Sequence, residues 1–240
     1  MSKLTPLTYE PFGFIVIEEN DDYVVIDKAP GVDVHRDGDD AGITEKVSQV
    51  LGLEKLYLVH RLDKVTSGLM VLAKNSEVCA QLAALFKART VEKFYLAVSA
   101  KKPKKKQGWI VGDMERSRRG SWKLTGGKTN PAVTQFFSKP LQAGFRAFLL
   151  KPGTGKTHQL RVALKSIGAP ICGDVLYDDA RTASQEQRTY LHAYGLSFSW
   201  HGTPRHYRVW PSLGEHYLSE TFSALKLLWS EPEQLPWPKP

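Results

Sequence analysis

A short polar block between two apolar runs constrains this chain more than any other feature. The block covers residues 60–68 and reads HRLDKVTSG. The flanking runs at 56–59 and 69–72 are apolar and partly β-branched, which predicts two buried strands. The block is then a loop held at both ends, with the Asp63 carboxylate close to a guanidinium. Asp63 is a candidate nucleophile, although Asp, Thr, Ser and Gly also form ordinary turns, and Arg61 with Asp63 would equally make a structural ion pair.

The rest of the pattern predicts a mixed, largely antiparallel α+β fold. Strand-like runs outnumber helical ones, and short turns join many of them. A polar turn between the first two runs indicates an antiparallel hairpin. The expected strands cover residues 14–17, 23–26, 93–98, 132–137 and 145–150, and the expected helices cover 44–51, 76–89 and 158–167.

The domain organisation is simple in the sequence. We find no linker and no internal repeat, and 240 residues suit one domain or two small ones. We expect a single domain over residues 1–230. The Pro-rich tail over 231–240 is expected to be frayed or loosely packed.

Composition narrows the class of protein. The 33 Lys and Arg residues exceed the 25 Asp and Glu residues, and the formal charge of +8 favours a polyanionic partner without proving one. The two Cys residues form no CxxC pair, so neither a disulfide framework nor a metal-thiolate spacing is present. No apolar signal core is seen, and no stretch approaches the ~18 apolar residues of a membrane span. A reducing cytoplasm is the simplest location.

Two hydrolytic alternatives are weak. The run at 152–157 looks like the end of a phosphate-binding P-loop, but position 150 is Leu where that motif needs Gly. A hydrolase triad is no better supported, because Ser67, His60 and Asp63 crowd one loop and no G-x-S-x-G elbow exists. The seven histidines lack HExxH spacing, and an isolated histidine such as His192 is more often structural than a ligand.

Four blocks of the chain, in order, resemble the signatures of the RluA-type pseudouridine synthases. Four ordered blocks are far more specific than one short motif. They are Lys28-Ala-Pro-Gly31 with Val34-His35, the polar block with Leu69, Glu92-Lys-Phe-Tyr-Leu-Ala97, and Thr154-Gly-Lys-Thr-His-Gln-Leu-Arg161 with Gly173-Asp174 and Tyr177.

The resemblance implies a curved central sheet with flanking helices and an isomerase that converts a specific uridine of structured RNA to pseudouridine. The reaction breaks the N1–C1′ bond and rejoins the sugar to C5. It involves no redox change and no phosphoryl transfer, so we expect no cofactor and no metal. It requires an ionised carboxylate, either as a nucleophile at C1′ or C6 or as a base that removes the 2′ proton on a glycal route. Both routes stay open.

The resemblance also assigns roles to residues. Asp63 becomes the catalytic carboxylate and Arg161 the arginine that keeps it ionised, since a neighbouring guanidinium lowers the pKa of a carboxyl group by ~1–3. Tyr95 becomes the aromatic that stacks on the extruded base and assists proton loss at C5, although an isolated strand tyrosine is more often a core residue. Arg61 would fill the stack or hold the backbone when the uridine leaves. The substrate-binding candidates are Arg61, Leu160, His60, Thr66 and His158.

RNA is the partner that the resemblance implies, without a membrane, and we expect a monomer. Family members that lack an S4 domain include enzymes for tRNA stem-loops and for large-subunit rRNA, so the target stays open. The rival interpretation is an RNA-binding protein or RNA chaperone that has kept the fold without catalysis. The run Lys101–Lys106, with Trp109 and Trp122 after it, has the basic and aromatic mix of a nucleic-acid surface, although such runs are usually solvated loops. A second basic stretch holds Arg116, Arg118, Arg119 and Lys123.

Overall fold

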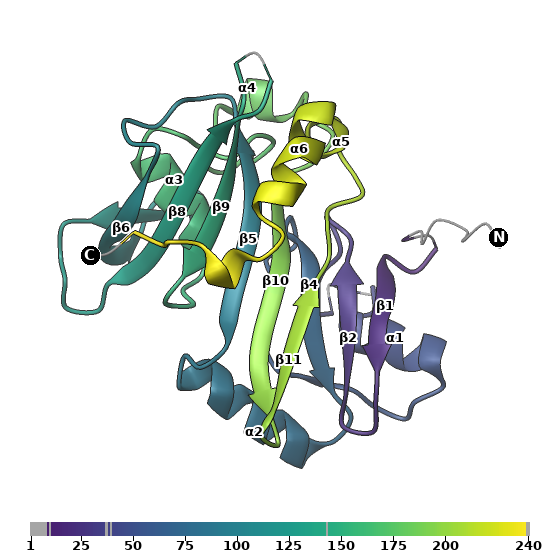
Figure 1. Ribbon diagram of the computed structural model, residues 1–240. Helices are drawn as coiled ribbons and strands as arrows, with labels where there is room; N and C mark the ends of the chain where they lie inside the picture. Colours follow the sequence, from purple (N-terminus) through teal and green to yellow (C-terminus); the bar gives the residue numbers. More distant parts are fainter. Residues whose placement is uncertain (1–8, 10, 37, 39, 143, 239–240) are drawn as a thin grey trace. The chain divides into compact units, whose positions relative to one another are not determined.

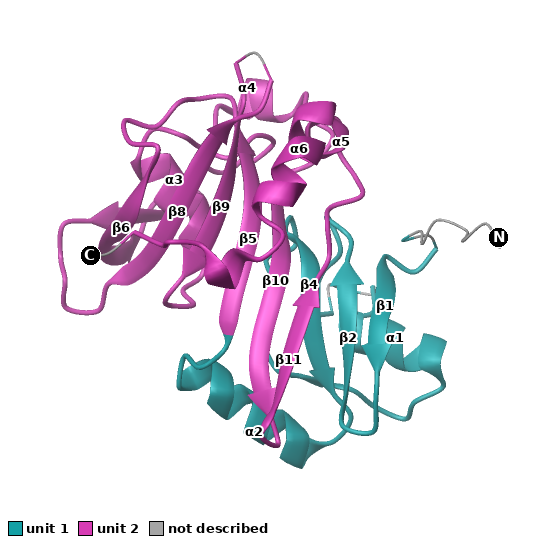
Figure 2. Cartoon of the chain, viewed as in Figure 1, with its two compact units in different colours: residues 1–91 teal, residues 92–240 magenta. Residues whose placement is uncertain are grey.

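The chain divides into two compact units in a computed structural model that describes residues 9, 11–36, 38, 40–142 and 144–238. Unit 1 covers residues 1–91 and unit 2 covers residues 92–240 (Figures 1 and 2). The boundary falls where a strand begins, and no change in composition marks it. The strand pairs within each unit are antiparallel and helices pack beside them, which confirms the predicted α+β class.

Unit 1 holds the predicted hairpin and the polar block. Its strands follow the order β1-β2-β4, and β3 also pairs with β4. Every residue of β2 and β4 is buried, as expected of strands without polar alternation. The elements are β1 (Phe14–Glu19), β2 (Tyr23–Lys28), α1 (Ile43–Leu51), β3 (Tyr57–Leu58), β4 (Ser67–Ala73) and α2 (Ser76–Lys87).

Local chemistry sets the ends of the two helices in unit 1. The side chain of Asn75 accepts the Val78 N–H at 2.9 Å and caps the first turn of α2. The helix ends at Lys87, two residues before the predicted end, because Arg89 adopts a left-handed conformation with φ of 60°. Helix α1 ends as predicted, and Gly52 supplies the left-handed cap with φ of 67°.

The described residues of unit 2 form strands β5 to β11. The strand order is β11-β10-β5-β9-β8-β6-β7. Its strands are β5 (Glu92–Ser99), β6 (Gln107–Arg116), β7 (Trp122–Thr125), β8 (Ala132–Pro140), β9 (Arg146–Pro152), β10 (Leu191–Trp200) and β11 (Thr203–Arg208). Its helices are α3 (Gln159–Ser166), α4 (Ala180–Ala183), α5 (Glu215–Leu218) and α6 (Glu220–Leu228), with single turns η1 (Arg118–Gly120) and η2 (Pro232–Gln234).

The two faces of this sheet carry different elements. The register aligns Tyr95 with Leu150 and Leu150 with Phe136, so these three side chains share one face. Helix α3 packs on that same face, because Gln159 donates its amide N–H to the hydroxyl of Thr134, two residues from Phe136. Tyr95 therefore lies on the face that α3 covers.

The C-terminal segment, residues 229–238, covers the opposite face. The indole ring of Trp237 packs on Phe137 and Phe94, with ring centroids 4.8 and 5.9 Å apart. The carbonyl of Pro238 accepts hydrogen bonds from the side chains of Trp109 and Gln135 at 2.6 and 2.9 Å. The prediction of a frayed tail is therefore wrong for the described part of it, because Trp237, between Pro236 and Pro238, packs on the sheet.

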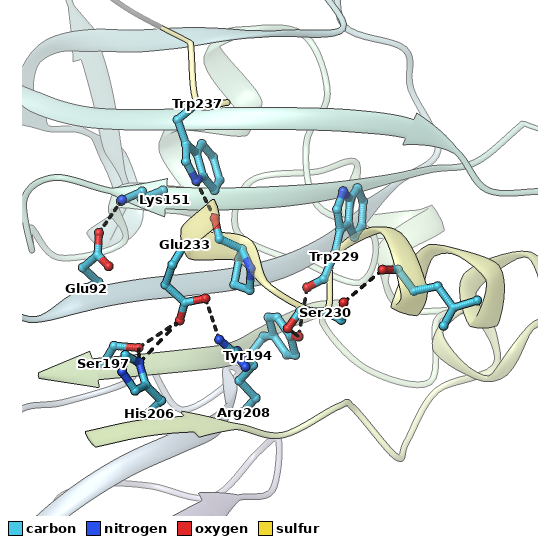
Figure 3. Close-up of polar contacts among 12 residues, drawn as sticks. Glu92, Lys151, Tyr194, Ser197, His206, Arg208, Trp229, Ser230, Glu233 and Trp237 are labelled. Atoms are coloured by element: carbon cyan, nitrogen blue, oxygen red, sulfur yellow. Dashed lines mark hydrogen bonds and ion pairs between the residues drawn. The ribbon is translucent and has the colours of Figure 1, made fainter. Parts of the chain in front are cut away.

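Hydrogen bonds to the Glu233 side chain hold the middle of the C-terminal segment (Figure 3). Glu233 accepts hydrogen bonds from Arg208 at 2.6 Å and from the Ser197 hydroxyl at 3.0 Å. Burial opposes ionisation of Glu233, but these hydrogen bonds, with one from its own backbone, outweigh burial and lower its pKa.

Within the described residues, no helix has both the length and the apolar character that crossing a bilayer requires.

Candidate active site

The Asp63 loop of unit 1 is held by a buried lysine. Lys28 is fully buried at the end of β2, and its ammonium group donates to the carbonyls of Ala29, Val32 and Lys64 at 2.8, 2.9 and 3.2 Å. The Lys64 carbonyl, one residue after Asp63, also accepts the Gly31 N–H at 2.9 Å. The Lys-Ala-Pro-Gly block is thus joined to the main chain of the loop by the Lys28 side chain and the Gly31 N–H.

The loop around Asp63 is further fixed by its own turn. The Thr66 N–H donates to the Asp63 carbonyl at 2.9 Å, and Thr66 is buried together with Leu62. Arg61 is exposed and Asp63 is partly exposed. The loop therefore keeps its apolar side chains inside and leaves Asp63 accessible.

His60 makes its described contacts within unit 1. Its Nε2 atom accepts the Val71 N–H at 3.0 Å, and its ring stacks on Phe86 with centroids 4.4 Å apart. Both contacts fix the start of the Asp63 loop. These contacts suit a positioning residue, and the predicted contact of His60 with substrate stays a prediction.

Arg161 in unit 2 forms a buried, bidentate ion pair. Its Nε and Nη2 atoms donate to the two carboxylate oxygens of Asp174 at 2.7 and 2.9 Å. The residues are 5% and 1% exposed, respectively. Two parallel hydrogen bonds fix the plane of the guanidinium, which a single contact would leave free to rotate. The predicted pairing of Arg161 with Asp63 joins residues of different units and stays a prediction.

Tyr177 joins Arg161 to two further elements. Its ring lies under the Arg161 guanidinium, with 4.9 Å between the Cζ atom and the ring centroid. Its hydroxyl accepts the Trp122 N–H at 2.9 Å and pairs with His158 Nδ1 at 2.8 Å. We name the set Arg161, Asp174, Tyr177 and His158 the Arg161 cluster. It places four residues of the fourth motif block in contact, and one of them, His158, is also a predicted substrate-binding residue.

Gln159 explains the rest of the Thr154–Arg161 block. Its carbonyl oxygen accepts from the Thr154 hydroxyl at 2.7 Å and from the Lys156 N–H at 3.0 Å, and its amide donates to the Val133 carbonyl at 3.0 Å. The loop before α3 is therefore fastened to β8. His158 completes it with a left-handed conformation, φ 56°, as the N-cap of α3. The sequence prediction gave Gln159 no role, although its place inside the motif was the available signal.

Tyr95 and Leu160 belong to the wall of the core. Tyr95 is partly exposed and packs against the main hydrophobic cluster of unit 2, and Leu160 is 7% exposed within that cluster. The partial exposure of Tyr95 suits a ring that offers one side to a ligand. The roles predicted for Tyr95 and Leu160 are not tested by these contacts alone.

His192 and a cluster of three further titratable residues in unit 2 lie outside the four motif blocks. Burial and the nearby charge of Arg188 lower the pKa of His192 to about 3, so the ring is neutral and its Nε2–H donates to the Val209 carbonyl at 2.8 Å. In the described part of the chain, Glu186, Glu215 and His216 bring one possible metal ligand atom each within 4.8 Å of one another. His216 Nδ1 lies 3.0 Å from the side-chain nitrogen of Gln142, and His216 Nε2 lies 3.3 Å from a carboxylate oxygen of Glu186 without the geometry of a hydrogen bond.

The chain is similar to known pseudouridine synthase sequences. The family model of RNA pseudouridylate synthases matches residues 22–166, more than half of the chain. A Haemophilus influenzae protein described as an uncharacterised RNA pseudouridine synthase is 45% identical over 218 residues, covering 90% of this chain and 96% of that protein. The ribosomal large subunit pseudouridine synthase C of Rickettsia bellii is 38% identical over 146 residues, covering 59% of this chain and 48% of its own length.

Solved structures agree with these sequence matches. The human RNA pseudouridylate synthase domain containing 4 superposes with a TM-score of 0.70 at 27% identity, covering 85% of this chain and 91% of that chain. The human domain-containing 1 protein gives a TM-score of 0.73 at 23% identity over the whole of both chains, which supports the fold. The family match, the full-length bacterial relative and the motif residues together show that this chain belongs to the RNA pseudouridine synthase family of isomerases, of the RluA type.

Proposed function

We propose that this protein isomerises one specific uridine of a structured RNA to pseudouridine, with Asp63 as the catalytic carboxylate. The observation that carries the proposal is the anchorage of the Asp63 loop by Lys28 and Gly31, which holds a partly exposed carboxylate on a rigid turn. A carboxylate needs this kind of fixed presentation to act as a nucleophile or a base. Family membership supports the same chemistry.

The reaction has a simple balance of atoms. The N1–C1′ bond breaks, the uracil turns, and a new C1′–C5 bond forms. C5 then loses its proton and N1 gains one, so no electron carrier or phosphoryl donor is needed. Asp63 would act either by attacking C1′ or C6 or by removing the 2′ proton, and both routes remain part of the proposal. We expect no cofactor.

Tyr95 and Arg161 would supply the other functions. Extrusion of the uridine from a stem-loop costs a few kcal/mol, and stacking on an aromatic ring returns roughly 1–3 kcal/mol. The partly exposed ring of Tyr95 suits this role, and its hydroxyl would assist proton loss at C5. Arg161 would keep Asp63 ionised, and Asp174 would orient the guanidinium for that purpose. Exposed Arg61 would fill the place that the uridine leaves.

The protein would act as a monomer in the cytoplasm, and its RNA partner would be tRNA or large-subunit rRNA. One relative is named for the large ribosomal subunit, and this brings rRNA into consideration without deciding the target. Leu160, His60, Thr66 and His158 would complete the substrate-binding region. The alternative is a non-catalytic RNA-binding protein or chaperone. No contact among the described residues favours it, and the experiment below distinguishes it from the enzyme.

Pseudouridine mapping at nucleotide resolution tests the proposal. Total RNA from cells that lack the protein is compared with RNA from the same cells carrying the intact gene. We expect one or a few positions to lose pseudouridine, and those positions name the substrate. An unchanged map, together with RNA binding by the purified protein, would favour the non-catalytic alternative.

A further inference from the structure

A two-stranded arm extends beyond the sheet of unit 2. Strand β6 pairs with β8 as far as Gly112, and from Asp113 to Arg116 it pairs with β7 instead. We call residues 113–125 the basic arm. Its tip is the turn η1, where Arg119 and Gly120 both have positive φ values, 54° and 74°. The Ser121 hydroxyl and N–H both bind the Arg118 carbonyl, at 2.8 and 3.1 Å, so the tip is ordered by its own backbone.

The charges of the arm are mostly unneutralised. Arg116, Arg118, Arg119 and Lys123 are all exposed. Of the two acidic residues, Asp113 is engaged by the N–H groups of Thr129 and Asn130 at 3.1 and 2.9 Å, and Glu115 lies 3.3 Å from Lys123. No carboxylate among the described residues lies within 4.0 Å of Arg118 or Arg119. The tip therefore offers two guanidinium groups to an anion.

The arm contacts the Arg161 cluster through Trp122, which pairs with Arg116 next to the tip. The Trp122 N–H donates to the Tyr177 hydroxyl, and Tyr177 contacts both His158 and Arg161. The indole ring of Trp122 is partly exposed and lies under Arg116, with 5.6 Å between Cζ and the ring centroid. An RNA strand bound to the arm would lie beside the residues that the proposed reaction uses.

We propose that the basic arm binds phosphates of the RNA strand next to the target uridine, through Arg118 and Arg119. This inference rests on the proposed function for the identity of the ligand. The chemistry is general, because arginine binds phosphate oxygens through its planar set of N–H donors. Such contacts hold the RNA in position without reading its bases, so the arm contributes affinity and not the choice of uridine.

The Lys101–Lys106 run is the competing surface and serves as the matched control. Its lysines are exposed too, but Pro103 is buried and the Lys106 carbonyl accepts the Ser138 N–H at 2.7 Å, so part of the run is a packed connection. Its contact near the Arg161 cluster is an ion pair of Lys101 with Asp178 at 3.9 Å. Removal of two charges from either segment changes the net charge of the protein equally.

The test compares Arg118→Gln/Arg119→Gln with Lys104→Gln/Lys105→Gln and the unmodified protein. The probe is a fluorescein-labelled RNA stem-loop of arbitrary sequence, titrated by fluorescence anisotropy at several salt concentrations. Each lost phosphate contact should flatten the plot of log affinity against log salt by about 0.7–0.9, so the arm variant should lose about 1.5 in slope. The lysine variant should keep the slope of the unmodified protein.

Two results would overturn the proposal: an arm variant with the slope of the unmodified protein, or equal losses in the arm and lysine variants. Turnover of RNA from cells lacking the protein separates this failure from failure of the proposed function. The arm variant should raise KM about tenfold or more and leave kcat within about twofold, because the arm touches no reacting atom. If the unmodified protein makes no pseudouridine, the proposed function is wrong. The salt dependence of RNA binding still tests whether the basic arm contacts phosphates.

Discussion

The Asp63 loop and the Arg161 cluster hold charged groups in different ways. In unit 1, Lys28 and Gly31 grip the main chain beside Asp63, so the position of the loop is set by backbone carbonyls. In unit 2, the guanidinium of Arg161 is itself a structural element, because the buried carboxylate of Asp174 accepts two parallel hydrogen bonds from one edge of it. In the first arrangement the backbone beside a partly exposed side chain is fixed, and in the second the buried side chain itself is fixed.

This difference predicts how function and stability separate on mutation. A change at Asp63 alters an accessible side chain and leaves the main-chain hydrogen bonds of its loop in place. A change at Arg161 leaves Asp174 as an uncompensated charge in a buried site, which is among the costliest defects in a folded protein. Mutation of Arg161 should therefore reduce both activity and stability. Mutation of Asp63 should reduce activity and leave stability nearly unchanged.

The largest expected effect on stability is that of Arg161→Met. We expect a loss of about 3–5 kcal/mol in the free energy of unfolding, because Asp174 loses both hydrogen bonds to its partner. Turnover should be lost as well. Urea denaturation measures the first effect, and Arg181→Met, at an exposed position on α4, is the control that should stay within about 0.5 kcal/mol.

A double-mutant cycle with Asp174→Asn sharpens this prediction. The double variant should be much less destabilised than the sum of the single variants, because removal of both charges leaves no uncompensated ion. If the losses in the free energy of unfolding add, Arg161 and Asp174 do not stabilise each other. The claim that the Arg161 side chain is part of the structural support in unit 2 would then be wrong.

A smaller effect is expected for Lys28→Met. The apolar side chain fills a similar volume but leaves the buried carbonyls of Ala29 and Val32 without their donor, at about 1–3 kcal/mol. The comparison is with Lys74→Met. The ammonium group of Lys74 binds the exposed Glu19 at the surface, so its loss should cost less than about 1 kcal/mol. If the two variants unfold at the same urea concentration, the Asp63 loop is not held by Lys28.

The smallest of these effects concerns Tyr95 in RNA binding. Tyr95→Phe keeps the ring and loses the hydroxyl, whereas Tyr95→Ala loses the stacking surface, worth roughly 1–3 kcal/mol. Binding of an RNA that carries 5-fluorouridine at the target position should weaken far more for Ala than for Phe. Equal binding by both variants would return Tyr95 to a purely structural role in the core.

Local signals in the sequence predicted much of the fold. The hairpin of β1 and β2, helices α1 and α2, and strands β4, β5, β8 and β9 follow from hydrophobic pattern and turn residues. Strands β10 and β11, the arm and the short helices α4 to α6 were not predicted. In β10, nine of the ten residues are buried, so no alternation of buried and exposed residues marks it as a strand.

The site was predicted less completely, for a physical reason. The motif residues could be identified, but the contacts that fix them join positions far apart in the chain. Lys28 reaches the carbonyl of Lys64 and Tyr177 reaches Trp122, separations of 36 and 55 residues, which no local pattern encodes. The packed end at Trp237 was missed in the same way, because prolines indicate the absence of regular structure and not the absence of contacts.

Tritium release from RNA that carries uridine labelled at C5 tests the central claim most directly, with the unmodified protein compared to Asp63→Asn. Asparagine has nearly the same shape but is neither an ionised nucleophile nor a base. We predict that the unmodified protein releases tritium and that the variant releases none, while the variant binds the RNA within about tenfold and unfolds within about 1 kcal/mol of the unmodified protein. Substantial tritium release by a folded, RNA-binding Asp63→Asn variant would contradict the assignment of Asp63 as the catalytic carboxylate.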